Sequence, residues 1–568
     1  MTNEQNQLQD AIYSNDYLDL IFDPNASVFQ EGRIEQNPLS VTPNPKYKIH
    51  FLDRKTNPPL NLGYYNYYEI PHCYGLMDIS ALNESGSDFI QNQSNLDVTG
   101  NGVLIGFLGT GIDYTHPVFI DSGGRTKILS IWDQTIPAET YHPDLPYGTE
   151  FTREQINEAL NHENPFEIVP SRDTIGHGTQ LAGIAAGNRQ SADAFSGMAP
   201  GSQLVIVKLK EAKANLKEYY GIAPDMLVFQ TTDLMMALSY LRNASVRLGL
   251  PMVICIGLGT SLGGLTLRNP LEHYIENLAE TEGFSIVSAI GNEGLEGTTY
   301  IGNINNSLGR ENVEILVGQE YGFTLELWGQ PPNIYSLSIQ TPFGETMPKL
   351  HIRGRGSLSH EFITSQTILQ IDYLMSEQNS GNQIIQIKFK NPMRGIWTVT
   401  VYKQAYDTSD YFMKLPIRNF LRSDTRFMRP TPDYSLVKPA GVRNIVSVAA
   451  YDLQTGNVYN GSSWGYINVY DTKPDLAAPG VNILVPNLHH GFSTATGSSI
   501  AAACTAGSIA LLFEWMIRYH IPWAPNSPGT KNFLTRGARQ IPGIQFPNKR
   551  MGYGKLDLAS SYEQVLNL

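Results

Sequence analysis

The hydrophobic positions of this chain follow two patterns that succeed each other along its length. Four runs are apolar at nearly every position, as in strands buried on both faces of a parallel sheet: VLIGFL (103–108), QLVIVKL (203–209), MVICIGL (252–258) and FSIVSAI (284–290). Residues 225–249 lie among them and have the spacing and length of a helix. This rhythm predicts an α/β fold with a mostly parallel sheet flanked by helices.

Between about residue 295 and residue 430 the pattern changes. Apolar and polar residues alternate in short segments separated by Gly/Pro turns: VEILVGQ (313–319), FTLELWG (323–329), IIQIKFK (384–390) and WTVTVYK (397–403). Such alternation is typical of an antiparallel sheet or sandwich. The first pattern then returns in NIVSVAAYD (444–452), followed by a long apolar helix over 500–517. The chain therefore predicts an all-β module inserted into an α/β domain.

These patterns divide the 568 residues into four parts. Residues 1–95 form an N-terminal region rich in Asn, Pro and Tyr. Residues 96–294 and 437–568 are the two parts of the α/β domain, and residues 295–436 are the inserted β-sandwich.

The composition and the net charge of the chain indicate which classes of binding partner to expect. Hydrophobic residues make up 41% of the chain and charged residues 16%, as in a globular protein. The net charge of −13 repels phosphate backbones and anionic lipid surfaces. We therefore expect neither a nucleic acid nor a membrane as partner.

The cysteines and the apolar stretches indicate in which cellular compartment the protein is expected. Cys73, Cys255 and Cys504 are odd in number and far apart, which predicts three reduced, buried thiols instead of disulfides or a zinc site. The N-terminal residues lack the basic and apolar regions of a secretion signal. No stretch approaches 18 uncharged apolar residues, so we expect no transmembrane helix and a cytoplasmic protein.

Three segments carry side chains suited to nucleophilic catalysis. GVLIGFLGTGIDYTHPVF (102–119) is a buried strand running into a glycine turn. DTIGHGTQLAG (173–183) places His177 between glycines, and TGSSIAAACTAG (496–507) places Ser499 at a helix start, where the helix dipole favours a developing oxyanion. Taken singly, Ser499 could be an N-cap hydroxyl and His177 a buried core histidine.

In this order the three segments resemble the Asp, His and Ser motifs of the subtilase family. Further segments resemble the same family: GMAPGSQLVIVK (197–208), SAIGNEG (288–294), PDLAAPG (474–480) and GYGKLDL (552–558). The resemblance covers about residues 96–293 and 437–560. It implies a subtilisin-like fold and a serine endopeptidase that acts on peptide or protein substrates.

The resemblance also implies roles for single residues. Ser499 is expected to be the nucleophile and His177 its base. Asn292 is expected to supply the side-chain donor of an oxyanion hole, with the Ser499 N–H as second donor. From its sequence alone, Asn292 could instead be a turn residue with positive φ.

The run IGLGTSLGG (256–264) resembles the edge strand that pairs with the substrate backbone. The resemblance therefore implies that Gly257, Leu258 and Gly259 bind substrate. Gly257 stands where the family usually has serine, so the cleft is expected to be somewhat altered.

One departure concerns the catalytic aspartate. Where the family has Asp-Thr-Gly, this chain has Gly-Thr-Gly over residues 109–111, so Gly109 occupies the position of the missing aspartate. Asp113 and Asp173 are conceivable substitutes, but neither is expected at the strand end that faces the histidine ring. Activity is therefore expected to be strongly reduced.

No cofactor or metal is expected. The run GTGIDY (109–114) could open a dinucleotide-binding fingerprint, but Tyr114 stands where the third glycine is needed and no matching acidic residue follows. The chain contains no HExxH, Walker loop or EF-hand pattern. Subtilases often bind calcium, yet no segment here spells out such a site.

Within the family, the chain resembles the Csp germination proteases of clostridia and their gut relatives. The matching features are IPHCYGLMDISALNESG (70–86), IWDQTI (131–136) and the β-insert. This implies a jelly-roll insert and a cytoplasmic or spore-associated protein. It also implies that residues 1–95 act as a prodomain-like chaperone lying over His177 and Ser499, with any self-cleavage product beginning near residue 90.

Two functions from different classes remain open. The first is a weakly active serine endopeptidase, with a role in spore germination. The second is a catalytically inactive pseudoprotease that binds a partner or its own N-terminal region. The presence of His177, Ser499 and Asn292 favours the first, and Gly109 favours the second. Whether Gly109 is natural or engineered is left open by the sequence.

Overall fold

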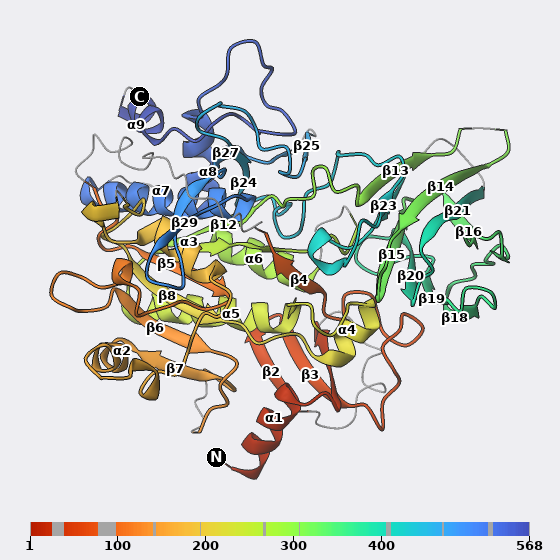
Figure 1. Cartoon of the computed structure of the whole chain (residues 1–568), viewed down its shortest axis with the longest axis horizontal. Helices are drawn as coiled ribbons and strands as arrows, with labels where there is room; N and C mark the ends of the chain where they lie inside the picture. The colour runs from red at the N-terminus through yellow and green to blue at the C-terminus, as the bar shows by residue number, and fades with distance from the viewer. Residues whose placement is uncertain are drawn as a thin grey trace.

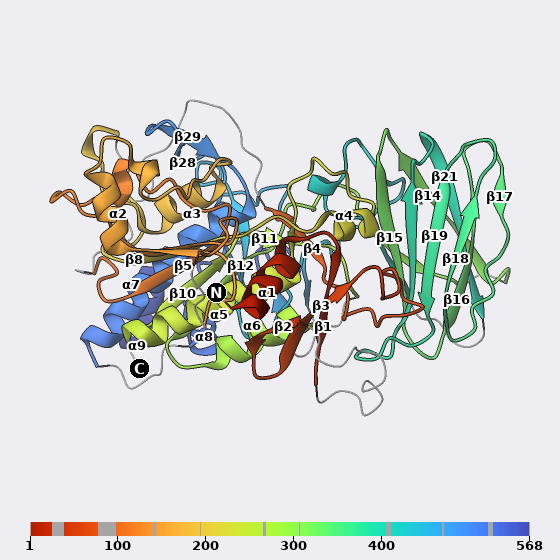
Figure 2. The same cartoon turned by 90° about the horizontal axis from the view of Figure 1, so that it is seen from below.

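The computed structural model describes residues 2–24, 39–77, 98–139, 144–193, 195–264, 269–305, 307–404, 410–467, 471–520 and 526–566. The α/β part lies at one end of the long axis and the β-rich insert at the other (Figures 1 and 2). The N-terminal helix and strands, drawn in red, lie near the middle of the molecule.

An eight-stranded sheet forms the centre of the α/β part, in the order β27–β24–β12–β10–β5–β8–β6–β7. Its strands are β5 (Leu104–Gly109), β6 (Ile128–Asp133), β7 (Thr149–Thr152), β8 (Gln203–Lys208), β10 (Met252–Ile256), β12 (Phe284–Ala289), β24 (Val446–Tyr451) and β27 (Leu476–Pro479). Neighbours are parallel except β6 and β7. The four continuous apolar runs form β5, β8, β10 and β12, as predicted.

Helices cover both faces of this sheet. Ile105 and Phe107 of β5 pack in the same core as α3 (His177–Ala186) and α7 (Ser498–Arg518). Leu104 and Leu108 point to the other face and pack in the core of α5 (Thr231–Leu248) and α6 (Pro270–Glu280). The predicted α/β class with a mostly parallel, helix-flanked sheet is therefore confirmed.

Helix α7 is mostly apolar, and its charged residues, Glu514 and Arg518, lie near its C-terminal end. Of the described residues, only α7 forms a helix long and apolar enough to cross a membrane, and 94% of its apolar window is buried inside the protein. It packs against α3 and the strands β10, β12 and β24. Its composition is that of a core helix.

The insert consists of two antiparallel sheets (Figure 1). One contains β13 (Thr299–Asn303), β15 (Gly322–Gly329), β18 (Arg355–Glu361), β19 (Ile368–Leu374), β20 (Gln383–Lys390) and β22 (Asp410–Lys414). The other contains β14 (Arg310–Val317), β16 (Ile334–Gln340), β17 (Thr346–Met347), β21 (Gly395–Gln404) and β23 (Arg426–Phe427). Phe389 and Trp397 pack across the interface between them, with ring centroids 5.4 Å apart. The domain boundaries at 95, 294 and 436 stay predictions.

Smaller elements complete the chain. They are α2 (Arg153–Leu160), α4 (Ala214–Tyr220), α8 (Ser527–Arg536), α9 (Leu558–Leu566), β25 (Tyr466–Ile467), β26 (Thr472–Lys473), β28 (Ile483–Pro486) and β29 (Phe492–Ala495). A three-stranded sheet, β11–β4–β9, joins β4 (Cys73–Leu76) to β9 (Phe229–Gln230) and β11 (Leu258–Gly259). The helix expected over 225–249 begins only at Thr231, because the two residues of β9 pair with β4 instead.

The N-terminal region begins with α1 (Asn3–Tyr13) and an antiparallel sheet of β1 (Tyr17–Phe22), β2 (Leu39–Asn44) and β3 (Tyr47–Asp53). Asp19 of β1 is buried and forms an ion pair with the buried Lys213 of the α/β part. The Gln230 side-chain amide donates a hydrogen bond of 2.7 Å to the other Asp19 oxygen. Burial lowers the pKa of Lys213, and the Asp19 charge opposes this shift. This ion pair is one of the contacts that join the two parts, beside the pairing of β4 with β9 and β11.

We expect Asp19→Ala to destabilise the protein by about 3–5 kcal/mol, because it leaves the Lys213 ammonium buried and unpaired. The free energy of unfolding in denaturant measures this. The exposed Asp16 serves as control, and Asp16→Ala should change stability by less than about 0.5 kcal/mol. Equal effects of the two substitutions would show that the ion pair does not hold the N-terminal region.

Candidate active site

His177 and Ser499 lie in the first turns of two helices. Helix α3 begins at His177, directly after Gly176, whose φ of +97° is one that glycine adopts easily. Helix α7 begins at Ser498. A Cβ placed on Gly257 would lie 3.0 Å from Cε1 of His177 and 3.3 Å from Cβ of Ser499. The structure thus brings all three residues together in one buried site.

The contacts of Ser499 distinguish it from a capping residue. Gly497 is the N-cap of α7, so the interpretation of Ser499 as an N-cap hydroxyl is wrong. Its side chain is fully buried, and its Oγ accepts and donates no hydrogen bond among the described residues. The Ser499 backbone N–H donates to the carbonyl oxygen of Met77, at 3.3 Å.

Asn292 follows β12 and uses both ends of its side-chain amide. Its Nδ2 donates a hydrogen bond of 2.7 Å to the same Met77 carbonyl oxygen. Its Oδ1 accepts the Ser498 N–H at 3.0 Å, which fixes the side chain to the start of α7. The left-handed residue of the turn is Gly291, with φ of +107°, so the interpretation of Asn292 as a positive-φ turn residue is wrong.

The edge strand β11 pairs with the N-terminal region. Leu258 and Gly259 pair antiparallel with Leu76 and Gly75. The Met77 N–H donates to the Gly257 carbonyl oxygen at 3.1 Å, one step further along the same ladder. A Cβ on Gly259 would lie 3.1 Å from Sδ of Met77, so the Met77 side chain lies against this glycine. Residues 73–77 thus lie as an extended peptide along the edge strand and pair with it.

Sequence reasoning did not single out Met77. Its signal is weak, because the phrase PHCYGLMD (71–78) shows only a short apolar stretch around a glycine. Met77 is the last described residue of this segment, and the expected product start near residue 90 lies outside the described residues. Residues 78–97 lie outside the described part of the chain, so the boundary at 95 stays a prediction.

Gly109 is the last residue of β5, where it pairs with Lys208. A Cβ placed on Gly109 would meet no atom within 4 Å, and its φ is not left-handed. The following turn packs against the start of α3, because the Gly178 N–H donates to Oγ1 of Thr110 at 2.9 Å. Position 109 therefore has open space for a Cβ, next to the turn that packs against the start of α3.

The two aspartates considered as substitutes hold local structure. Asp173 accepts the N–H groups of Ile175, Gly176 and Thr179 and the Thr179 hydroxyl, at 2.8–3.0 Å, which stabilises the start of α3. Asp113 accepts the N–H and hydroxyl of Thr115 through one oxygen. Its other oxygen lies 3.5 Å from Nε2 of His490. These contacts give both carboxylates structural roles.

Glu293, next to Asn292, is buried and faces the sandwich. Both of its carboxylate oxygens accept the Arg418 N–H at 3.1 Å, and Thr298 donates its hydroxyl at 3.2 Å. Burial raises the pKa of Glu293 to about 7. The carboxyl group thus links the segment carrying Asn292 to a loop of the insert.

The predicted free thiols are confirmed, since Cys73, Cys255 and Cys504 are unpaired and buried. Burial raises the pKa of the Cys504 thiol to about 12. Among the described ranges, no group of three or more His, Cys, Asp or Glu side chains is arranged to hold a metal ion.

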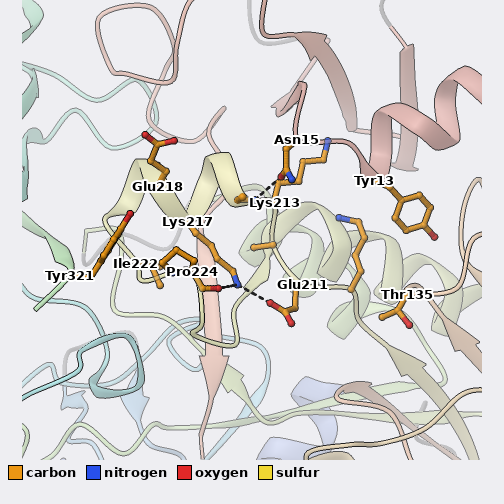
Figure 3. A pocket seen from close by; sticks show the side chains of 13 residues that line it. Tyr13, Asn15, Thr135, Glu211, Lys213, Lys217, Glu218, Ile222, Pro224 and Tyr321 are labelled. Carbon is orange, nitrogen blue, oxygen red and sulfur yellow. Dashed lines mark hydrogen bonds and ion pairs between the residues drawn. The ribbon is translucent and has the colours of Figure 1, made fainter. Parts of the chain in front are cut away.

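A cavity of about 490 Å³ lies apart from His177 and Ser499, among α1, the loop before α4, and Tyr321 of the insert (Figure 3). Three lysines face it, and each is compensated by a carboxylate. Lys217 pairs with Glu211 at 2.8 Å, Lys210 with Asp233 at 2.8 Å, and Lys213 with Asp19. The cavity is therefore a polar junction between three parts of the chain.

We expect Gly178→Ala to disturb the site, because its Cβ would lie 2.0 Å from the Gly111 carbonyl oxygen. The backbone must then shift, at a cost of about 1–3 kcal/mol in unfolding free energy. Gly109→Ala, where the Cβ meets no atom within 4 Å, is the matched control and should change stability by less than about 1 kcal/mol. If denaturant unfolding shows the opposite order, the described turn packing is wrong.

Comparison with known proteins identifies the family of the chain. The sequence profile of the Subtilase family matches residues 100–314 and 427–554, more than half of the chain. The solved structure of the Clostridium perfringens CspB protease is similar, with 30% sequence identity and a TM-score of 0.74. That alignment covers 84% of this chain and 95% of the CspB chain. The predicted resemblance to the subtilases and their Csp branch is confirmed.

Two curated proteins are more distant. The PII-type proteinase of Lacticaseibacillus paracasei is 23% identical over 522 residues, which cover 83% of this chain and 26% of that protein. The subtilisin-like protease SBT2.2 of Arabidopsis thaliana is 30% identical over 152 residues, 24% of this chain and 17% of that protein. The matches thus span only about a quarter or less of the length of these two relatives.

Proposed function

Because this chain belongs to the subtilase family, we propose that it is a subtilisin-like serine endopeptidase that cleaves peptide bonds through an acyl-enzyme on Ser499. His177 is the general base. The Asn292 amide and the Ser499 N–H form the oxyanion hole. One observation carries the proposal: these two donors converge on a single peptide carbonyl oxygen, that of Met77.

The protein's own N-terminal region is the proposed first occupant of the cleft. Residues 73–77 pair with Gly257, Leu258 and Gly259 as a substrate would, and the Met77 carbonyl lies where the reacting carbonyl belongs. The proposed bond for self-cleavage is therefore Met77–Asp78. The product start near residue 90 that the family resemblance implied falls outside the described residues and stays a prediction.

The proposed activity is slow because Gly109 stands where the family has its aspartate. That aspartate holds the imidazole in the tautomer that accepts the serine proton and stabilises the imidazolium that forms. Removing it from a related enzyme costs roughly 3 × 10⁴ in kcat. At about 1.36 kcal/mol per tenfold, this is about 6 kcal/mol of transition-state stabilisation. The oxyanion hole and the Ser499–His177 pair retain the remaining catalysis.

Gly109 also favours the second candidate function, an inactive pseudoprotease that uses the same cleft for binding. In that case the N-terminal strand stays covalently continuous and the site serves as a docking groove. The resemblance to the Csp branch supports a role in spore germination and a cytoplasmic or spore-associated location for either function.

We expect Gly109→Asp to restore activity, because the glycine backbone accepts an L side chain and the site has room for it. The self-cleavage rate should rise by about 10⁴-fold. Intact-mass spectrometry of the purified chain should then show a product that begins at Asp78. The parent chain should remain at 63.0 kDa or process very slowly.

Ser499→Ala in the Gly109→Asp background is the control and should abolish the product. Labelling by a serine-directed phosphonate gives an independent measure of the nucleophile. If Gly109→Asp folds but neither cleaves itself nor reacts with the phosphonate, the endopeptidase proposal fails and the pseudoprotease remains.

We expect a chain that starts at residue 78 to give less folded, soluble protein than the full chain. Parallel sheets form slowly because their contacts are distant in sequence, and the N-terminal region supplies a docked template. Co-expressing residues 1–77 as a separate chain should restore the yield. If the shortened chain folds equally well alone, the chaperone role of the N-terminal region is wrong.

A further inference from the structure

A loop of the sandwich forms one wall of the candidate cleft. It connects β22 to β23 and contains the short 3₁₀ helix Arg418–Phe420. Resting on the proposed function, we infer that this loop makes the enzyme selective for glycine at the third residue before the scissile bond. It also holds the carbonyl of the second residue before that bond.

Gly75, the third residue before the proposed bond, lies directly against the loop. A Cβ placed on Gly75 would be 2.7 Å from Cδ1 of Ile417 and 3.0 Å from Cε1 of Phe420. Both loop side chains are buried, with exposures of 0% and 3%, so neither can move aside cheaply. Any residue larger than glycine at this position therefore forces the wall or the strand to shift.

The backbone of Gly75 does not itself require glycine. It lies in β4, and it is absent from the residues with positive φ in the described chain. Glycine in a strand lowers stability unless it permits a close approach. Here Ile417 and Phe420 make the close approach. Glycine is therefore needed at position 75 because there is no room for a larger residue.

Asn419 lies between these two apolar contacts and binds the strand directly. Its Nδ2 donates a hydrogen bond of 2.7 Å to the carbonyl oxygen of Leu76, the second residue before the proposed bond. The loop thus contacts the occupant of the cleft through one polar and two apolar side chains. Because the polar contact is to backbone, it is independent of the residue at the second position.

The wall is fixed on both sides. The Arg418 N–H donates to both oxygens of the buried Glu293, the neighbour of Asn292. The Arg418 guanidinium donates to the Ser423 carbonyl oxygen at 2.7 Å, which closes the loop on itself. Ser261, two residues after β11, donates its hydroxyl to the Leu415 carbonyl oxygen at 2.7 Å. A wall held by these hydrogen bonds excludes larger side chains by its shape, because it does not move to accommodate them.

The first test uses the full chain as it exists and needs no catalysis. Gly75→Ala and Gly75→Val should expose residues 73–77, with amide hydrogen exchange in that segment at least about tenfold faster than in the parent. Adding Ile417→Val, which removes the nearer contact, or Phe420→Ala, which removes the other, should restore protection to Gly75→Ala. Ile363→Ala, an 87% exposed position on the same sandwich, is the matched control and should restore nothing.

The second test measures self-cleavage after Met77 in the Gly109→Asp background. Gly75→Ala should slow it by about 10- to 200-fold, the range for one misplaced methyl group in a tight pocket. Ile417→Val or Phe420→Ala should recover most of this loss, and Ile363→Ala should recover none. Failure of Gly109→Asp to cleave even with Gly75 present would count against the proposed function, and the exchange test would still decide the role of the wall.

Two results would overturn the inference. One is unchanged exchange in residues 73–77 for both Gly75 variants. The other is an accelerated exchange that neither Ile417→Val nor Phe420→Ala reduces, since the crowding would then come from elsewhere in the cleft.

Discussion

The architecture depends on one carbonyl oxygen, that of Met77, and on the two donors that reach it. The donors belong to Asn292, after a central strand, and to Ser499, in the first turn of α7. Both residues are buried, and a buried donor left without an acceptor costs about 1–3 kcal/mol. The N-terminal strand therefore supplies the acceptor for two buried donors, and it also covers the site. The Met77 carbonyl thus joins three parts of the chain that are distant in sequence.

This arrangement favours retention of the strand. Met77 accepts hydrogen bonds through its carbonyl and donates through its N–H to Gly257, and the preceding residues continue the ladder on both edges. Under the proposed function, another peptide enters the cleft only by displacing this strand, which the ladder holds in place.

The elements that can be predicted from the sequence are those that depend on local pattern. The elements that it misses depend on pairing between segments that are distant along the chain. The continuous apolar runs identify the central strands, and small residues around His177 and Ser499 place both at helix starts. Phe229 and Gln230 look helical by spacing, yet they form a strand because β4 lies beside them. The position of Met77 likewise follows from a hydrogen bond to Gly257, a partner far along the chain. The space beside Gly109 is a property of packing that no local pattern contains.

The point of insertion explains why the sandwich bears on the cleft. After β12 the chain runs through Glu293 to β13 of the sandwich, and after β23 it comes back beside β12 at Val437, whose N–H donates to the Ile290 carbonyl oxygen at 3.0 Å. Val437 then packs against Gly259, leaving no room for a Cβ there. Both ends of the module thus lie beside the donors and the edge strand, and its 415–423 loop lies across the occupant. The sandwich has its own closely packed core, so it is stiff. A displacement of the module would therefore move its two ends and its 415–423 loop together. The stiffness of the sandwich is thus transmitted to the site.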